Sequence, residues 1–124
     1  ILAAVLEAGA VDNQARSRRL QQLDHVKQFI LDNLDNSDLD IDTIARERNI
    51  APRTLNRLFA REGTTPIRWV WQQRLAASHR ALSEGRISRV TDAAFEFGFK
   101  DVSHFSRAFK AAYGRSPRSV KRRR

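Results

Sequence analysis

The sequence predicts an all-α protein in which about seven helices form two helix-turn-helix subdomains joined by a long linker helix. Three observations support this prediction. Glycine and proline, which commonly interrupt helices, are scarce at five and three of 124 residues. Apolar residues recur at the three- and four-residue spacing of amphipathic helices almost throughout the chain. Finally, one pattern of short helix, tight turn and second helix occurs twice.

The first two expected helices lie before residue 50. Apolar residues from Leu20 to Leu34 share one face of a helix, which the Asp and Asn residues after Asp32 should end. Asp40 is a suitable N-cap for a short helix, because its carboxylate can accept a hydrogen bond from a free backbone N–H group. Asn49 then stands where the chain must turn, and asparagine tolerates the left-handed backbone conformation better than most residues.

A third helix and a long fourth helix follow. Pro52 suits the first turn of a helix, and we expect this helix to stop at Gly63. Thr65 and Pro66 then begin a helix with apolar residues along one side, which ends at Gly85. Because it lies between the two copies of the repeated pattern, this long helix should join the two halves of the protein.

Three shorter helices complete the prediction. Residues 88–97 form a short helix that Gly98 ends, and Asp101 caps the next helix. Ser116 and Pro117 open a last helical turn before the basic sequence KRRR at the C-terminus.

The two halves of the chain repeat one another. IARERNIAPRTLNRLFAREGTTP, residues 44–66, aligns with AAFEFGFKDVSHFSRAFKAAYGRSP, residues 93–117. Both copies end in Gly-x-Thr/Ser-Pro, and their pentads LNRLF and FSRAF correspond. The repeat divides the chain into four expected parts. They are residues 1–19, the end of an upstream domain plus a linker; 20–64, the first helix-turn-helix subdomain; 65–84, the linker helix; and 85–124, the second subdomain with its basic tail.

The composition indicates a polyanionic partner. The net charge is +9, and the first fifteen residues contain two acidic side chains and no basic one, so the rest of the chain carries +11. Such an excess indicates nucleic acid most often and an anionic membrane less often. The chain has no cysteine, which excludes disulfides and cysteine-based metal sites. No apolar run approaches the roughly 18 residues that span a membrane, and no motif calls for a cofactor.

With these motifs in place, the sequence resembles the AraC/XylS-type bacterial transcription regulators over about residues 20–122. The most specific parts are the second copy with its closing GRSP and the joining helix TPIRWVWQQRLAASHRAL. Two residues depart from the family pattern: Asn49 replaces the usual turn glycine, and Ala51 replaces the usual capping serine. The resemblance implies sequence-specific binding of double-stranded DNA by two recognition helices in successive major-groove segments. It also implies a role near RNA polymerase, usually as an activator in the bacterial cytoplasm.

The second helix of each copy should bury one face and expose the other. The buried residues are Leu55, Leu58 and Phe59 in the first copy and Phe105, Ala108, Phe109 and Ala112 in the second. By resemblance, the exposed residues contact bases. They are Arg53, Asn56, Arg57, Val102, Ser103, Ser106 and Arg107. Arginine can bind guanine, asparagine adenine, serine several bases, and valine a thymine methyl group. Arg57 and Arg107 hold equivalent positions, so a contact to phosphate suits them as well as a contact to a base.

Phosphate contacts are expected from basic side chains around the two motifs and in the tail. They are Arg16, Arg18, Arg19, Arg68, Lys110, Arg118, Lys121, Arg122 and Arg123.

Arg74 on the joining helix is interpreted as bracing the two halves. Trp69 and Trp71 are interpreted as packing between the subdomains. The acidic segment 32–42 should face away from DNA, either for capping and solubility or as a contact surface for RNA polymerase or an effector domain.

Two other classes of function were weighed. Phe95, Phe97 and Phe99 alternate as in a strand that stacks RNA bases, but the flanking residues are helical in pattern and no other stretch supplies a sheet partner. We therefore assign Phe97 and Phe99 to the core of the second motif and leave the burial of Phe95 open. A non-specific basic domain is the remaining binding alternative. An enzyme is disfavoured, because the three histidines lie on different expected helices and no catalytic motif is present.

The chain also suggests a longer gene product. It contains no methionine, including at position 1, and its apolar opening is followed by a polar stretch. The resemblance implies that a sensing and dimerising domain precedes residue 20.

Overall fold

A computed structural model describes residues 2–122, and the side chains of residues 9–122. Over this range it contains seven α-helices and no strand, which confirms the predicted all-α class. The helices are α1 (Leu2–Asp32), α2 (Ile41–Glu47), α3 (Pro52–Ala60), α4 (Pro66–Ser83), α5 (Val90–Glu96), α6 (Val102–Tyr113) and α7 (Pro117–Val120).

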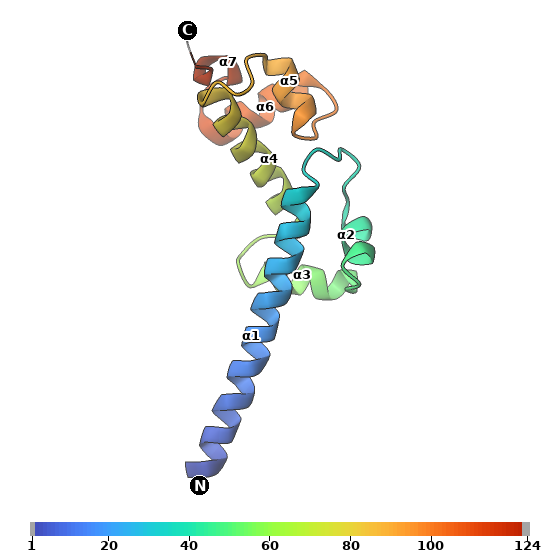
Figure 1. Ribbon diagram of the computed structural model, residues 1–124, viewed down its shortest axis with the longest axis vertical. Helices are drawn as coiled ribbons and strands as arrows, with labels where there is room; N and C mark the ends of the chain where they lie inside the picture. Colours follow the sequence, from blue (N-terminus) through green and yellow to red (C-terminus); the bar gives the residue numbers. More distant parts are fainter. Residues whose placement is uncertain (1, 123–124) are drawn as a thin grey trace.

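The molecule is elongated, with two groups of helices arranged along its long axis (Figure 1). The C-terminal part of α1 packs with α2 and α3, and α4 leads from this group to the second group, α5 to α7. The N-terminal part of α1 extends beyond the first group (Figure 1). Each group is therefore one copy of the short helix, turn and second helix, with α4 shared between them.

Each group has its own apolar core. The first core includes Leu23, Val26, Ile30, Ile44, Leu55, Phe59 and Val70, and the second includes Leu82, Ala93, Ala94, Phe99, Phe105 and Phe109. The joining helix contributes Val70 to the first core and Leu82 to the second. Burial of both ends of one helix in different cores makes α4 the covalent and packing link between them.

Four helices begin as their sequences predict. The N-cap side chain accepts a hydrogen bond from the backbone N–H three residues later at Asp40, Thr65, Asp101 and Ser116. This hydrogen bond from Thr43 N lowers the pKa of Asp40 below its ordinary value. The helix α3 begins differently, because Ala51 offers no side-chain acceptor and Pro52 occupies the first position. Asn49 adopts a φ of 53°, as expected for a tight turn.

The first helix is longer than expected. Residues 1–19 are predicted as the end of an upstream domain plus a linker, but α1 runs from Leu2 to Asp32 without a break. The stretch lacks proline and contains alanine, glutamine and arginine, which favour helices. Leu20, expected on the packed face, is 53% exposed, because core packing on α1 starts at Leu23. The boundaries of the four sequence parts stay a prediction.

The aromatic stretch 95–99 consists of the end of α5 and the turn after it, so the RNA-binding strand is not formed. Residues 90–96 lie in α5, and Gly98 ends the turn after it with a φ of 83°. Phe99 is buried in the second core as predicted, whereas Phe97 is half-buried and packs against the first core. Phe97 therefore contacts the opposite half of the molecule from the one expected. Phe95 is 52% exposed and belongs to neither core.

The two tryptophans of α4 pack against the apolar cores. Trp69 lies 5.9 Å from the ring of Phe59 and packs against the first core. Trp71 lies 5.1 Å from the ring of Phe99 and packs against the second core. Each ring thus ties the joining helix to one core, rather than lying between the subdomains as expected.

Candidate nucleic-acid interface

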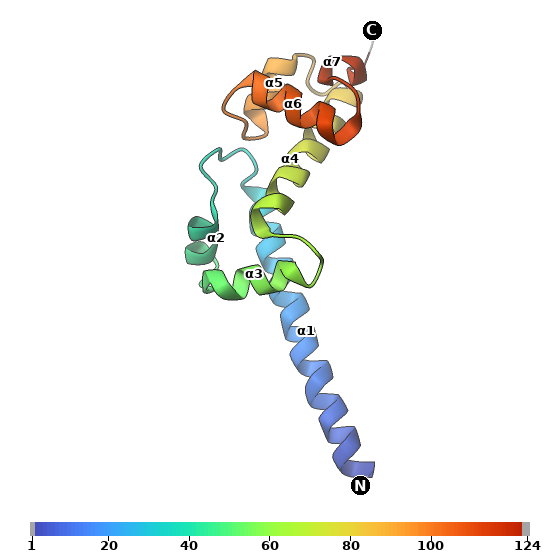
Figure 2. The same cartoon turned by 180° about the vertical axis from the view of Figure 1, so that it is seen from behind.

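The second helix of each motif lies on the same side of the molecule. In Figure 2, α3 and α6 both lie toward the viewer, one above the other along the long axis, with α4 between them. Each helix is held on its inner side by one core. Their outer sides are therefore free to contact one extended partner at two places.

The outer side of α3 is polar and basic. Leu55, Leu58 and Phe59 are buried, and this spacing of three and four residues leaves the intervening positions outside. The residues predicted for base contact, Arg53, Asn56 and Arg57, are all exposed. The predicted burial pattern of this helix is thus confirmed, and the three polar side chains lie on its exposed side.

The outer side of α6 is less regular. Ser103 and Arg107 are exposed, whereas Ser106 is half-buried. Val102 is also half-buried, because it packs against the second core, so it is less available than expected. Ala112 was expected to be buried but is exposed. The ring of Tyr113 instead packs at the last turn of α6, 4.8 Å from the ring of Phe109 and 4.6 Å from that of His79.

The residues predicted for phosphate contact spread over several elements. Arg68, Lys110 and Arg118 are exposed on α4, α6 and α7 respectively. Lys121 is half-buried and Arg122 exposed. Arg123 lies outside the described residues.

The three predicted arginines of α1 line two different grooves. Arg16 and Arg19 share one groove with Leu58 and Arg61 at the end of α3. Arg18 lines another groove with Arg48 at the turn between α2 and α3. Arg48 and Arg61 are not among the residues predicted from the sequence, although they line these grooves. Their position immediately beside the first motif was the available signal, since basic residues that flank a recognition helix commonly contact phosphate.

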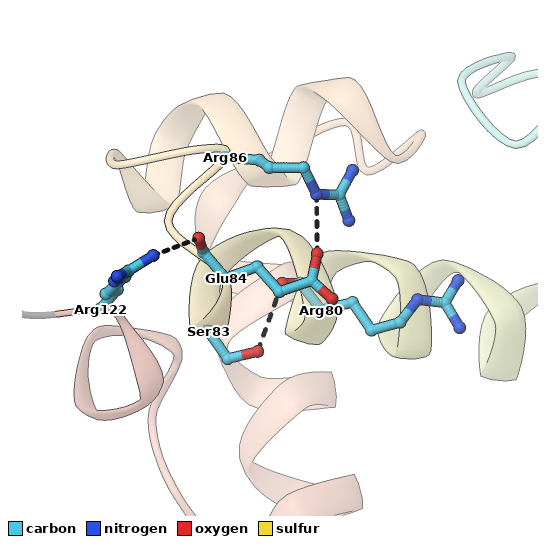
Figure 3. A network of polar contacts seen from close by, with 5 residues as sticks. All are labelled: Arg80, Ser83, Glu84, Arg86 and Arg122. Carbon is cyan, nitrogen blue, oxygen red and sulfur yellow. Dashed lines mark hydrogen bonds and ion pairs between the residues drawn. The ribbon is translucent and has the colours of Figure 1, made fainter.

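The basic tail is anchored to the end of α4. Figure 3 shows Arg122 and Arg86 approaching Glu84 from two sides. The backbone N–H of Arg122 donates to Leu82 O over 3.0 Å, and its guanidinium donates to Glu84 O over 3.4 Å. Arg86 Nε pairs with the carboxylate of Glu84 at 2.9 Å. These contacts fix where the tail leaves the second group of helices.

The basic residues of the outer faces are not neutralised within the described chain. In residues 9–122, ion pairs join Lys27 to Glu62, Arg86 to Glu84, and Lys100 to Asp38. None involves a residue predicted to contact a base. Charges that lack an internal partner remain available to an external anion.

The part of the chain that the structure describes was also searched for metal-binding groups and membrane-spanning helices. It contains no group of three or more His, Cys, Asp or Glu side chains arranged to hold a metal ion. Among the described helices, none combines the length and apolar character needed to cross a membrane.

Comparison with known proteins identifies the family. Residues 44–123 match the model of a helix-turn-helix domain family. The chain belongs to the AraC-type helix-turn-helix family of transcription regulators. It is 38% identical over 118 residues to the transcriptional activator NphR of Rhodococcus sp, which covers 94% of this chain and 35% of that protein. The chain thus spans about a third of the length of this relative.

Solved structures share the fold. The C-terminal domain of AraT, a response regulator from Geobacillus stearothermophilus, is 27% identical, with a TM-score of 0.74 over 83% of this chain and 85% of that one. An AraC-type transcriptional regulator from Chromobacterium violaceum is 25% identical, with a TM-score of 0.74 over 86% of this chain and 92% of that one. These matches confirm two helix-turn-helix motifs and a DNA-binding regulator, and they disfavour the RNA-binding alternative.

Proposed function

We propose that this chain binds double-stranded DNA through both motifs at once, with α3 and α6 in successive segments of the major groove. The observation that carries the proposal is the placement of the two helices on one side of the molecule, each with a polar outer face (Figure 2). Helix-turn-helix proteins place the second helix of the motif in the major groove. Two such helices on one side should therefore contact sites about one duplex turn apart.

The base contacts are assigned to the outer residues of the two helices. Arg53 and Asn56 are the best candidates for discrimination on α3, because both are exposed and their counterparts on α6, Ser103 and Ser106, differ. Arg57 and its counterpart Arg107 serve a base or a phosphate, and the half-buried Val102 contributes a small apolar contact.

Phosphate contacts complete the interface. The proposed set is Arg16, Arg18, Arg19, Arg68, Lys110, Arg118, Lys121, Arg122 and Arg123. Contacts of this kind position a protein on the duplex without reading sequence. Release of counterions from several phosphates makes the affinity fall steeply with salt.

Selection of bound duplexes from a random DNA pool tests the proposal. The purified chain should enrich a defined sequence with two conserved segments. Arg53→Ala and Asn56→Ala should each weaken binding by about 1–3 kcal/mol and relax the preference at one base position. The control Arg46→Ala removes an exposed arginine from α2 and should change no base preference. A loss of affinity that is uniform across sequences would make Arg53 and Asn56 phosphate contacts.

The whole protein is proposed to be a bacterial transcription regulator, most simply an activator. The chain matches about a third of the length of its relatives, and we propose that a sensing and dimerising domain lies upstream of residue 20. The protein would act in the cytoplasm, where bacterial DNA lies, and would contact RNA polymerase. Binding a promoter, rather than turnover of a substrate, is its proposed activity.

A further inference from the structure

A buried arginine lies where the two groups of helices meet. Arg74, on the joining helix α4, is 1% exposed, and no carboxylate in the described residues pairs with it. Its Nε donates to Leu34 O over 3.2 Å, and its Nη2 donates to Asn36 O over 2.6 Å. Both acceptors belong to the segment that follows α1. The guanidinium also lies 4.7 Å from the centre of the Trp71 ring.

Burial of the charged Arg74 guanidinium costs free energy, which its hydrogen bonds must offset. Desolvation lowers the pKa of Arg74 from its ordinary value, but arginine remains charged in proteins. A buried charge is tolerated when its hydrogen bonds are made, and removal of the donor would take from the buried Leu34 O the partner that Arg74 provides. Asn36 O also accepts from Leu39 N over 3.1 Å, so it would keep one hydrogen bond. The planar guanidinium can serve two acceptors in fixed directions, which lysine cannot do. Arg74 therefore specifies a geometry between α4 and the segment after α1.

The second group of helices contacts the same point. Gly98, in the turn before α6, has a φ of 83°, and a Cβ placed there would lie 2.7 Å from Arg74 Nε and would also collide with Leu34 O. Phe97 beside it packs into the first core, and Lys100 pairs with Asp38 at 3.0 Å. The turn formed by residues 97–100 therefore packs closely against Arg74 and Leu34 O.

This turn controls the start of α6. Asp101, the next residue, caps α6 through His104 N, and the rings of Phe99 and Trp71 lie 5.5 Å and 5.1 Å from that of His104. A shift of the turn would move the first residues of α6 with it. In the first group, Leu34 and the buried face of α3 belong to one core. The contact at Arg74 thus connects the core that holds α3 with the turn that precedes α6.

We propose that Arg74 and Gly98 form a positioning joint that fixes the distance and angle between α3 and α6, and hence the spacing of the two DNA segments that the chain accepts. The consequence for DNA rests on the proposed function. The joint itself is a property of the free protein and can be measured without DNA.

Spin labels measure the joint directly. The chain has no cysteine, so Ala60→Cys on α3 and Ala111→Cys on α6, both exposed, give one labelled pair. Double electron–electron resonance should show one narrow distance distribution in the parent. Arg74→Gln, Arg74→Lys and Gly98→Ala should broaden it or shift its maximum. Gly114→Ala is the matched control, because Gly114 also has a positive φ, of 68°, but a Cβ there would meet nothing within 4 Å.

The outcomes separate positioning from folding. Circular dichroism should show that Arg74→Lys keeps the helical content of the parent. A broadened distance in this folded variant and in Gly98→Ala, but not in Gly114→Ala, supports the joint. A distribution unchanged in Arg74→Gln and Arg74→Lys overturns it.

DNA spacing gives the second test. The probe is the duplex selected by the parent chain, with one base pair inserted or deleted between its two conserved segments, a change of roughly 3.4 Å along the axis. The parent should lose about tenfold in affinity, as for a mismatched site, and Arg74→Lys should lose less. Equal losses in both overturn the role of Arg74 in spacing. If the parent selects only one segment, the proposed function fails, while the spin-label distances still decide the joint.

Discussion

The substitution Ala51→Ser should stabilise the protein through the first recognition helix. Ala51 already has the extended backbone of an N-cap, with φ −65° and ψ 142°, and is exposed, but it offers no side-chain acceptor. Four other N-caps of this chain accept from the N–H three residues later, over 2.6 to 3.3 Å. A serine at position 51 should accept from Thr54 N in the same way.

The size of the effect follows from these caps. Replacement of an N-cap serine by alanine costs about 0.5–2 kcal/mol, so the reverse change should raise the free energy of unfolding by about 1 kcal/mol. For a chain of 124 residues, this corresponds to a rise in Tm of roughly 4 °C. Thermal and urea unfolding followed by circular dichroism measure both quantities.

A matched control is available in the same helix. Ala60→Ser makes the same chemical change at the last residue of α3, where it can cap no N-terminal N–H group, and should lower stability by a few tenths of a kcal/mol. An Ala51→Ser variant no more stable than the parent would refute the assignment of residue 51 as a cap in need of an acceptor.

Three further predictions follow from burial, titration and charge. Phe99→Ala should cost about 3–5 kcal/mol, as for other buried phenylalanines, whereas Phe95→Ala at a half-exposed position should cost under 1 kcal/mol; urea unfolding compares them. Because the folded state lowers the pKa of Asp40, its contribution is present above the unfolded pKa of about 3.9 and lost as pH falls below it. Asp40→Asn should therefore show less loss of stability than the parent between about pH 5 and pH 2. DNA affinity should fall steeply between 50 and about 200 mM salt, and a flat dependence in a binding titration would contradict the phosphate contacts.

Local chemistry explains which features the sequence could predict. The caps at Asp40 and Asp101 and the turn at Asn49 depend on a few neighbouring residues, and all three have the predicted geometry. The exposed faces of α3 and α6 follow largely from helical spacing. Motif order and the repeat were enough to place both recognition helices.

Features that depend on distant contacts were not predictable in the same way. Phe97 fits the helical pattern of its own motif, yet it packs against the other core. Leu20 continues the apolar face of α1, but it is 53% exposed and lines an open groove beside the end of α3. Arg18 and Arg48 line the same groove because α1 lies across the first motif, which the sequence pattern does not show. Helical periodicity indicates which face is apolar, but it cannot identify what packs there.

We propose that α3 and α6 bind one duplex together. Hydroxyl-radical footprinting of the selected duplex tests it most directly. We expect two protected segments on one face of the DNA, about one helical turn or roughly 34 Å apart. In Arg53→Ala the segment at α3 should weaken first, and in Arg107→Ala the segment at α6. A single protected segment, with no second one a turn away, would show that the two helices do not bind the duplex together.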